Sequence, residues 1–410
     1  MENVIERRGA APDAKEHHVR IRHSFLVAAL AVTALTATPG AAVASSDHVA
    51  EHHGDQHGDH AGAVQPSLRT LSMRSGLKVG TAVNMDLYGS DAAYTRIVDQ
   101  QFNTVTPENV MKWQLVEPTQ GTYDWAAADR LVAGAQADHQ LVRGHALVWH
   151  NQLPSWFSTD GATTSFTPQQ VRDLLHKHVI DEVSHFRGQI WQWDVVNEAF
   201  NDDGTPRQSV FYKAYQALGL NGLDYVADAF RWAHQADPHA LLFYNDYNLE
   251  FTGAKSNAVY GFVQQLRSQR VPIDGVGFQG HLDTQYGFPD LQNNLQRFAA
   301  LGLKVALTEV DVRTFVQPDA ANPGTYTDTP LTPALQATQE SYWKQTLQAC
   351  LGVPQCISYT VWGVADSNSW IPGVFTGEGA ALLFDDNLNP KPQYQDLRQI
   401  LWTTKAPRRA

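Results

Sequence analysis

The sequence predicts an α/β fold, a single (β/α)8 TIM barrel with a site at the C-terminal ends of its strands. Three observations predict it. Eight short apolar segments alternate with amphipathic segments after about Ser67, no linker-like composition interrupts this series, and polar and aromatic residues follow each apolar segment. Strands of a parallel sheet are buried on both faces, and a barrel of such strands carries its functional groups on the loops that follow them.

The expected strands are short runs in which apolar residues dominate. They cover residues 78–83, 102–106, 141–149, 190–196, 240–244, 275–279, 305–310 and 357–362. The expected helices are amphipathic stretches, and Thr167 followed by Pro168 is typical of a helix start. They cover residues 94–101, 126–138, 168–186, 223–236, 254–270, 290–300, 333–349 and 394–402.

Composition and charge restrict the classes of partner. The chain has 410 residues, of which 43% are hydrophobic and 18% charged, so it is long enough to bury a sizeable core. Its net charge is −12, and the sequence contains no basic stripe. We therefore expect no nucleic acid and no anionic membrane surface as partners. A neutral substrate is compatible with this charge.

The first 44 residues have the three parts of a secretory signal peptide. A basic stretch that includes Arg20 and Arg22 precedes an apolar run over residues 25–37, and the small residues Ala42, Val43 and Ala44 follow. The apolar run is short for a membrane span, which makes a retained anchor the lesser alternative. The sequence thus predicts a secreted, extracellular protein that has no membrane attachment once residues 1–44 are removed.

Residues 45–66 differ sharply from the rest of the chain. The stretch DHVAEHHGDQHGDH contains five histidines with Asp, Glu and Gly, and almost nothing apolar. It cannot bury enough surface to fold, so it is interpreted as a disordered His-rich linker. A metal-binding tail is the alternative, because neutral imidazole binds zinc, nickel and copper. The catalytic domain is then expected over residues 67–404.

The two cysteines, Cys350 and Cys356, lie six positions apart in the part expected to be exported. A local disulfide fits an oxidising compartment and would contribute only about 2 kcal/mol in the chain-entropy treatment. Two buried free thiols are the alternative. The segment 316–333, rich in Pro, Gly, Asp and Thr, is interpreted as a surface loop or, alternatively, as a rim of the cleft.

Two glutamates end expected strands that lie far apart in the chain, Glu198 and Glu309. Retaining hydrolysis of a glycosidic bond needs two carboxyl groups about 5–5.5 Å apart, one as nucleophile and one as acid. Because two such charges repel, the pKa of one is expected to rise. Asp311 shares the strand face of Glu309, and His281 on the neighbouring strand is expected to bridge them and keep Glu309 ionised.

Seven motifs carry a resemblance to a known family. In chain order they are TPENVMKW, RGHALVWHNQLPSWF, WDVVNE, YNDYN, GVGFQGHL, LTEVDV and VWGVADSNSW. Their order from about Gly80 to Tyr394 resembles the family-10 glycoside hydrolases, the endo-β-1,4-xylanases. The resemblance implies a (β/α)8 barrel and retaining endo-hydrolysis of xylan. The cysteine pair before VWGV is similar to a disulfide of many members.

The resemblance also implies roles for individual residues. Glu198 of WDVVNE resembles the acid/base, Glu309 of LTEVDV resembles the nucleophile, and Asp311 is a supporting residue. Asn197 resembles the asparagine that contacts the nucleophile and the sugar 2-hydroxyl. The residues expected to bind substrate are Glu108, Asn109, Lys112, His145, Trp149, Gln152, Asn197, Gln279, His281, Trp362 and Trp370. Of these, Trp362 and Trp370 resemble an indole lid on which a sugar face stacks.

Three positions depart from the family pattern, which often has Thr at Ala146, Ser at Asn151 and Ser at Gly280. They lie beside site residues and are expected to affect subsite strength and rate more than reaction type. The alternatives to a xylanase are a related β-1,4-glucanase or cellobiosidase and, in another class, a non-catalytic xylan-binding protein. The expected protein is a monomer that acts on xylan and needs no cofactor and no metal.

Overall fold

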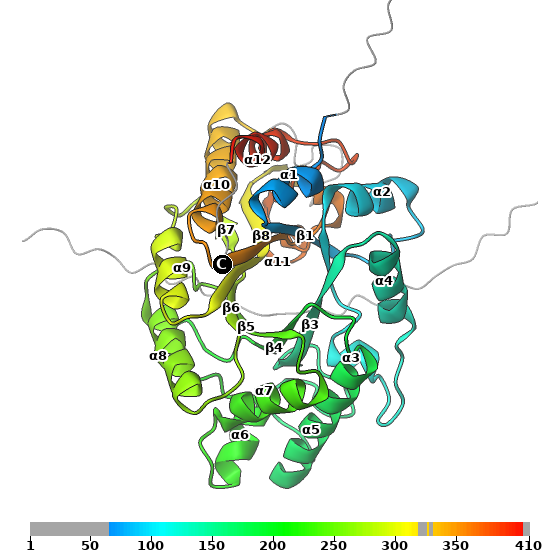
Figure 1. Ribbon diagram of the computed structural model, residues 1–410, viewed down its shortest axis with the longest axis vertical. Coiled ribbons are helices and arrows are strands. Elements are labelled where there is room, and N and C mark those ends of the chain that lie inside the picture. Colours follow the sequence, from blue (N-terminus) through cyan, green and yellow to red (C-terminus); the bar gives the residue numbers. More distant parts are fainter. Residues whose placement is uncertain (1–64, 319–325, 328–330, 405–410) are drawn as a thin grey trace, which may run out of the picture. The chain divides into compact units, whose positions relative to one another are not determined.

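Eight parallel strands pair side by side and close on themselves, which confirms the predicted (β/α)8 barrel (Figure 1). In order around the barrel they are β1 (Lys78–Val83), β2 (Thr104–Pro107), β3 (Leu141–Trp149), β4 (Gln192–Asn197), β5 (Leu241–Asp246), β6 (Gly275–Phe278), β8 (Lys304–Phe315) and β11 (Cys356–Val361). β11 pairs with both β8 and β1, so the barrel has no free edge.

The computed structural model describes residues 65–318, 326–327 and 331–404. They fall within one compact unit of the chain. The expected signal peptide, and the expected linker apart from Gln65 and Pro66, lie outside the described residues. Among the described residues, no helix is both long enough and apolar enough to cross a bilayer.

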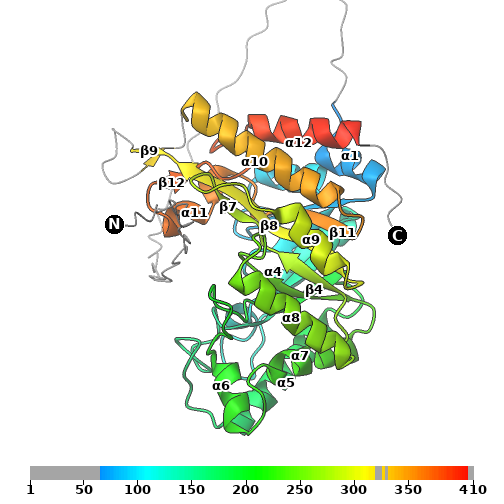
Figure 2. The same ribbon diagram turned by 90° about the vertical axis from the view of Figure 1, so that its left-hand side faces the viewer.

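All eight expected helices are present, and they surround the barrel (Figures 1 and 2). They are α2 (Ala92–Gln101), α4 (Ala126–Ala137), α5 (Pro168–His185), α7 (Asp224–Ala236), α8 (Ala254–Ser268), α9 (Leu291–Ala299), α10 (Pro333–Leu351) and α12 (Pro392–Thr403). The start of α5 has a local cause. Thr167 accepts a hydrogen bond from the Gln170 backbone in a capping box, and Pro168 occupies the first turn.

Several short elements were not expected from the sequence. They are the helices α1 (Leu68–Ser75), α3 (Trp113–Val116), α6 (Val210–Ala217) and α11 (Ile371–Val374), the 3-10 helix η1 (Asp366–Asn368), and the strands β7 (His281–Asp283), β9 (Gln317–Pro318), β10 (Tyr326–Thr327) and β12 (Glu378–Gly379). β8 is also longer than expected, because its outer half pairs with β7 and β12 beyond the barrel.

Two expectations about loops are changed by the structure. Gln65 and Pro66, assigned to a disordered linker, instead bond to α12. The Arg398 Nε donates to the Pro66 carbonyl at 3.0 Å, and its Nη1 donates to Gln65 Oε1 at 2.6 Å. The segment 316–333 contains the antiparallel pair β9–β10, and part of it lies outside the described residues. The predicted disulfide is confirmed, and Cys350–Cys356 joins the end of α10 to the start of β11.

Close packing in the barrel wall leaves room only for glycine at one position of the RGHAL motif. A Cβ at Gly144 in β3 would lie 2.2 Å from the Trp193 ring of neighbouring β4. Trp193 is fully buried, so the ring cannot move aside. Glycine at this position therefore allows the two strands to approach, and it places Arg143 and His145 on the interior side of β3.

One buried carboxyl in the helical layer has no hydrogen-bond partner. Glu182 of α5 is inaccessible, and both of its oxygens lack a partner. Burial raises the pKa of Glu182 well above its usual value. His178, whose Nε2 lies 3.4 Å away, does not compensate, because burial lowers its pKa to about 3. The folded protein therefore favours the protonated form of Glu182 more strongly than the unfolded chain does.

We predict that Glu182→Leu stabilises the protein at pH 8 by about 1–3 kcal/mol, since a buried polar group without partners is replaced by an apolar one. The folded protein binds the Glu182 proton more tightly than the unfolded chain, so the carboxyl lowers stability progressively as the pH rises above its ordinary pKa. The gain should be smaller at pH 5. Chemical denaturation at both pH values measures it, and an equal loss of stability at both would contradict the prediction.

Candidate active site

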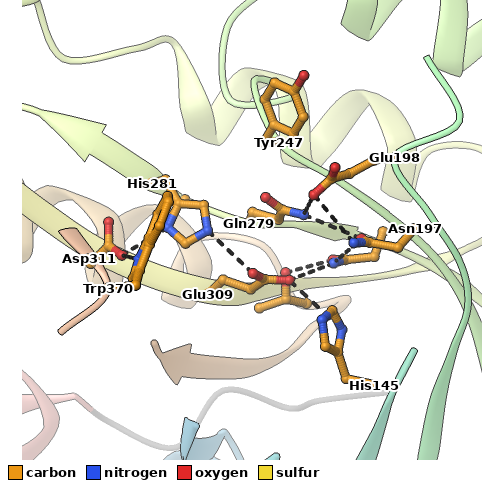
Figure 3. Close-up of polar contacts among 12 residues, drawn as sticks. His145, Asn197, Glu198, Tyr247, Gln279, His281, Glu309, Asp311 and Trp370 are labelled. Atoms are coloured by element: carbon orange, nitrogen blue, oxygen red, sulfur yellow. Dashed lines mark hydrogen bonds and ion pairs between the residues drawn. The ribbon is translucent and has the colours of Figure 1, made fainter. Parts of the chain in front are cut away.

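Glu309 lies inside the mouth of the barrel, on β8, and is almost completely buried. The His281 Nε2 lies 3.2 Å from one carboxylate oxygen (Figure 3). The Asn245 Nδ2 donates to the other oxygen at 2.7 Å. The Arg143 guanidinium is 3.6 Å from that second oxygen. Burial alone would raise the pKa of Glu309, but His281, His145 and Arg143 together lower it. The carboxylate is therefore held ionised.

His281 bridges Glu309 and Asp311, in the position that the sequence predicts for it (Figure 3). Its Nδ1 lies 2.9 Å from Asp311 Oδ2. Burial alone would lower the pKa of His281, but the two carboxylates raise it to about 10. His281 is therefore doubly protonated, so that each ring nitrogen donates to one carboxylate.

Glu198 follows β4 directly and lies at the same end of the barrel as Glu309. It has a φ of 59°, a left-handed conformation that is uncommon for a residue with a side chain. Its backbone is held on both sides: the N–H donates to the Asn245 carbonyl at 2.9 Å, and the carbonyl accepts from the Arg207 Nε at 2.9 Å. This strained turn directs the carboxyl toward Gln279 rather than along the strand.

Three donors surround the Glu198 carboxylate. The Trp149 indole donates to Oε2 at 2.9 Å, and Gln279 and Asn197 donate to Oε1 at 3.1 and 3.3 Å. Burial alone would raise the pKa of Glu198, but the charges of His150 and Arg207 and the hydrogen bonds from Gln279 and Trp149 lower it to about 2. The expectation that one carboxyl of the pair has a raised pKa is wrong here, because cations and donors outweigh both burial and repulsion.

The sequence resemblance implies that Asn197 contacts Glu309. In the structure no hydrogen bond joins these two side chains directly. The Asn197 Oδ1 accepts from the Asn245 Nδ2 at 2.9 Å, and it is Asn245 that reaches Glu309. The two asparagines are paired across β4 and β5, which puts the β5 residue nearer to the nucleophile candidate. Asn197 and Asn245 therefore form a bridge of amides between Glu198 and Glu309.

A second group of expected residues forms one wall of the site. The Lys112 Nζ donates to Asn109 Oδ1 at 2.9 Å and to Gln152 Oε1 at 2.6 Å, and it lies 5.0 Å from the centroid of the Trp149 ring. Burial lowers the pKa of Lys112 to about 8, although Glu108 and the two catalytic candidates oppose this. Burial also raises the pKa of Glu108.

The two expected lid tryptophans lie beside the histidines of the site. The Trp362 ring is 5.2 Å from the His145 ring, and the Trp370 ring is 4.9 Å from that of His281. The Trp370 indole also donates to Asp311 Oδ2 at 2.8 Å. Asp311 thus holds both His281 and the Trp370 indole.

Arg143 and Asp194 belong to the site but were not singled out from the sequence. The Arg143 Nη2 lies 2.5 Å from Asp194 Oδ2, and its Nη1 donates to the Thr308 carbonyl at 2.7 Å. The same Asp194 oxygen is 2.9 Å from His145 Nδ1. A signal existed: Arg143 and His145 stand two apart in an otherwise apolar strand, so both point to one face. Asn245, Arg207 and Tyr247 were missed as well.

The ligand atoms of His145, Asp194 and Glu309 lie within 4.8 Å of one another, a spacing that a metal ion could span. The Arg143 guanidinium occupies the same cluster and interacts with both carboxylates. Its positive charge already compensates them. The donor set therefore fits an ion-pair network that holds Glu309.

Two of the three departures from the family pattern have a local structural role. The Asn151 side chain accepts from the Gln152 backbone N–H at 2.9 Å, and Gln152 has a φ of 47°. Asn151 thus helps to hold Gln152 in a left-handed conformation. Gly280 has a φ of 81°, which glycine adopts without strain. For Ala146, nothing in the structure explains the replacement.

Residues 67–400 match the family description "Glycosyl hydrolase family 10". The chain belongs to glycosyl hydrolase family 10. Family-10 relatives include endo-1,4-beta-xylanase C of Phanerodontia chrysosporium, 41% identical over 335 residues that cover 80% of this chain and 78% of the relative. The endo-1,4-beta-xylanase of Agaricus bisporus is 40% identical over 80% of this chain and 93% of its own length.

Solved structures of the family are also similar to this chain. Native xylanase 10B of Thermotoga maritima has a TM-score of 0.73 and 38% identity, over 82% of this chain and 98% of that structure. Xylanase 10B of Thermotoga petrophila, solved in complex with xylobiose, has the same score and identity, over 82% and 97%. The family resemblance read from the seven motifs is thereby confirmed, and with it the retaining reaction class.

We predict that His150→Asn moves the alkaline limb of kcat/KM to higher pH, by about half a unit. This limb reports the pKa of the essential acid in the free enzyme. Without the His150 charge, Glu198 holds its proton more tightly, so the active form persists to higher pH. The pH profile on an unactivated xylo-oligosaccharide, whose leaving group needs the proton, measures it. His176→Asn, an exposed histidine on α5, is the control; an equal shift in both variants, or none in His150→Asn, would contradict the prediction.

Proposed function

We propose that this family-10 enzyme cleaves internal β-1,4-xylosidic bonds of xylan with retention, using Glu309 as the nucleophile and Glu198 as the acid/base. The observation that carries the proposal is the pair of buried carboxylates joined by shared amides, with one of them held ionised by His281. The names of the relatives, endo-1,4-beta-xylanases, and the xylobiose complex of a similar structure support xylan as the substrate.

In the first step, a Glu309 oxygen attacks the anomeric carbon while Glu198 gives its proton to the departing glycosidic oxygen. The bond between that carbon and oxygen breaks, and the glycosyl group remains as an ester of Glu309. His281, Asn245 and Arg143 keep Glu309 ionised for the attack. Because Glu198 has a low pKa, the protonated form is the minor one, and the step draws on that fraction.

In the second step, Glu198 removes a proton from water as the water oxygen attacks the anomeric carbon. The ester bond breaks, Glu309 leaves as a carboxylate, and the two inversions give net retention. The donors from Trp149, Gln279 and Asn197 stabilise Glu198 as an anion, which is the form that this step requires. The surroundings of Glu198 therefore suit the base half of the cycle.

Sugar binding is proposed to divide between rings and polar groups. The indoles of Trp362 and Trp370 suit the apolar face of a sugar at the cleavage point. The cluster of Lys112, Asn109 and Gln152 presents an ammonium group and two amides, which suit hydroxyl groups. Glu108, Trp149, His145 and Asn197 complete the proposed contacts.

The proposal extends to the organisation of the whole chain. Residues 1–44 are proposed as a secretory signal peptide and 45–66 as a His-rich linker, of which Gln65 and Pro66 pack on α12. The exported protein is proposed to act extracellularly as a monomer, without membrane attachment. The composition of the N-terminal segments supports export.

Product analysis tests the proposed function. We expect rapid release of reducing ends from the interior of xylan, at least about tenfold faster than from carboxymethyl-cellulose, and the β-anomer as the first product seen by NMR. Faster release from the cellulose derivative would favour a glucanase. An α-anomer formed first would exclude the double displacement.

We predict that Glu198→Ala lowers kcat/KM on xylan by about a thousandfold or more, but on a dinitrophenyl xylobioside by less than about tenfold. The activated phenol leaves without a proton, so the first step no longer needs an acid. Glu309→Gln is the matched comparison, because loss of the nucleophile should abolish turnover of both substrates. Equal losses on both substrates for Glu198→Ala would show that Glu198 is not the acid.

A further inference from the structure

Glu250 is a buried carboxyl near the active site that no step of the proposed mechanism uses. It lies on the loop after β5 and is 2% exposed. Its Oε1 accepts the backbone N–H of Gly280 at 2.6 Å. Burial raises the pKa of Glu250, while its own N–H, the Gly280 N–H and the charges of His281 and Lys255 oppose this. A fully buried acidic group needs a reason to be retained.

The partner of Glu250 stands between two residues of the active site. Gly280 forms the turn from β6 to β7, with a φ of 81°, and its neighbours are Gln279 and His281. The Gln279 side chain donates to Glu198, and its carbonyl accepts the Glu309 N–H at 2.7 Å. The His281 ring bonds Glu309 and Asp311. A shift of this one turn would therefore move a donor away from each catalytic candidate.

The loop that carries Glu250 is itself firmly attached. The carbonyl of the buried Leu249 accepts from the Asn294 Nδ2 of α9 at 2.7 Å, and the Thr252 N–H donates to Asp290 at 2.9 Å. The same loop begins with Tyr247, whose hydroxyl accepts from the Arg207 Nη2 at 3.1 Å, and the Arg207 Nε donates to the Glu198 carbonyl. Glu250 thus connects an anchored loop to a turn that has catalytic neighbours on both sides.

We propose that Glu250 is a positioning residue, whose carboxyl holds the Gln279–Gly280–His281 turn so that Gln279 stays on Glu198 and His281 stays on Glu309. The inference rests on the proposed roles of Glu198 and Glu309. Displacement of catalytic groups by about 1 Å can cost a hundredfold in rate, so one hydrogen bond that prevents it has a large effect. Glu250 itself touches no reacting atom.

The charges around these groups determine what a pH profile reports. Glu309 faces His281 from β7 and Arg143 and His145 from β3. His281 also faces Asp311 of β8, and Glu250 faces Lys255 of α8 as well as His281. Arg143 and His145 are held by Asp194, away from the turn. Release of the turn therefore removes His281 from Glu309 and leaves the other cations in place, which moves the acid limb of kcat/KM to higher pH.

The test compares Glu250→Leu with Glu250→Gln on a dinitrophenyl xylobioside. Leucine removes the acceptor, and we expect kcat to fall about thirtyfold or more, KM to stay within about threefold, and the acid limb to rise by about half a unit. Glutamine keeps an oxygen that can accept the Gly280 N–H. The kcat of Glu250→Gln should therefore stay within about fivefold of the wild-type value, with the acid limb of kcat/KM unchanged. A Leu variant with wild-type kcat and acid limb, or a Gln variant as impaired as Leu, would overturn the proposal.

Glu182→Leu is the matched control, since it makes the same change at a buried carboxyl in the helical layer, on α5. It should leave kcat and the acid limb of kcat/KM unchanged. If Glu250→Leu is not recovered folded, Glu250→Asp replaces it. The aspartate carboxyl is one methylene too short to reach Gly280. We expect kcat to fall about tenfold and the acid limb of kcat/KM to move to higher pH, as for Glu250→Leu. Wild-type kinetics in the Asp variant would overturn the positioning role.

Trapping of the wild-type enzyme with a 2-fluoro xylobioside, followed by peptide mass spectrometry, separates this inference from the proposed function. A label on Glu309 together with wild-type kinetics in Glu250→Leu would overturn the positioning role alone. A label on another residue would overturn the assignment of Glu309, and the positioning role with it.

Discussion

The ionised carboxylate of Glu309, buried inside the barrel, is the constraint on which the arrangement of the site depends. A charge removed from water must be matched by opposite charge and hydrogen bonds, or its carboxyl becomes protonated. Here the compensation comes from His281 on β7, Asn245 on β5 and Arg143 on β3. These groups need partners in turn, and Asp311 and Asp194 supply them. Closure of the barrel brings all these strands around one carboxylate.

The same concentration of donors and cations makes Glu198, the proposed acid/base, a stronger acid than an ordinary glutamate. Its pKa is lowered to about 2, which favours the anion, the form that the second step of the proposed mechanism requires. In the proposed mechanism, the first step needs the proton on Glu198 and draws on the minor form. His150 and Arg207 are the charges that lower this pKa most.

Backbone conformation does as much as side-chain chemistry in aiming these groups. Glu198 and Gln152 adopt left-handed conformations that neighbouring residues must hold in place. Gly280, where the family often has serine, occupies such a conformation without strain, and its N–H is bound by Glu250. Gly144 lets β3 approach Trp193, which keeps Arg143 and His145 in the interior. The polar site is therefore attached to an apolar wall that tolerates little change.

The sequence by itself determined the barrel, its strands and helices to within a few residues, and the two glutamates at strand ends, because apolar periodicity and motifs are local properties of the chain. Short elements such as α1 and β7 were not predicted from the sequence, since a few residues carry little periodicity. Only the tertiary structure decided that Asn245 rather than Asn197 contacts Glu309, that Arg143 pairs with Asp194, that the pKa of Glu198 falls, and that Glu250 holds Gly280. Each of these depends on which strands become neighbours and on how deeply the groups are buried, and that is settled only when the barrel closes.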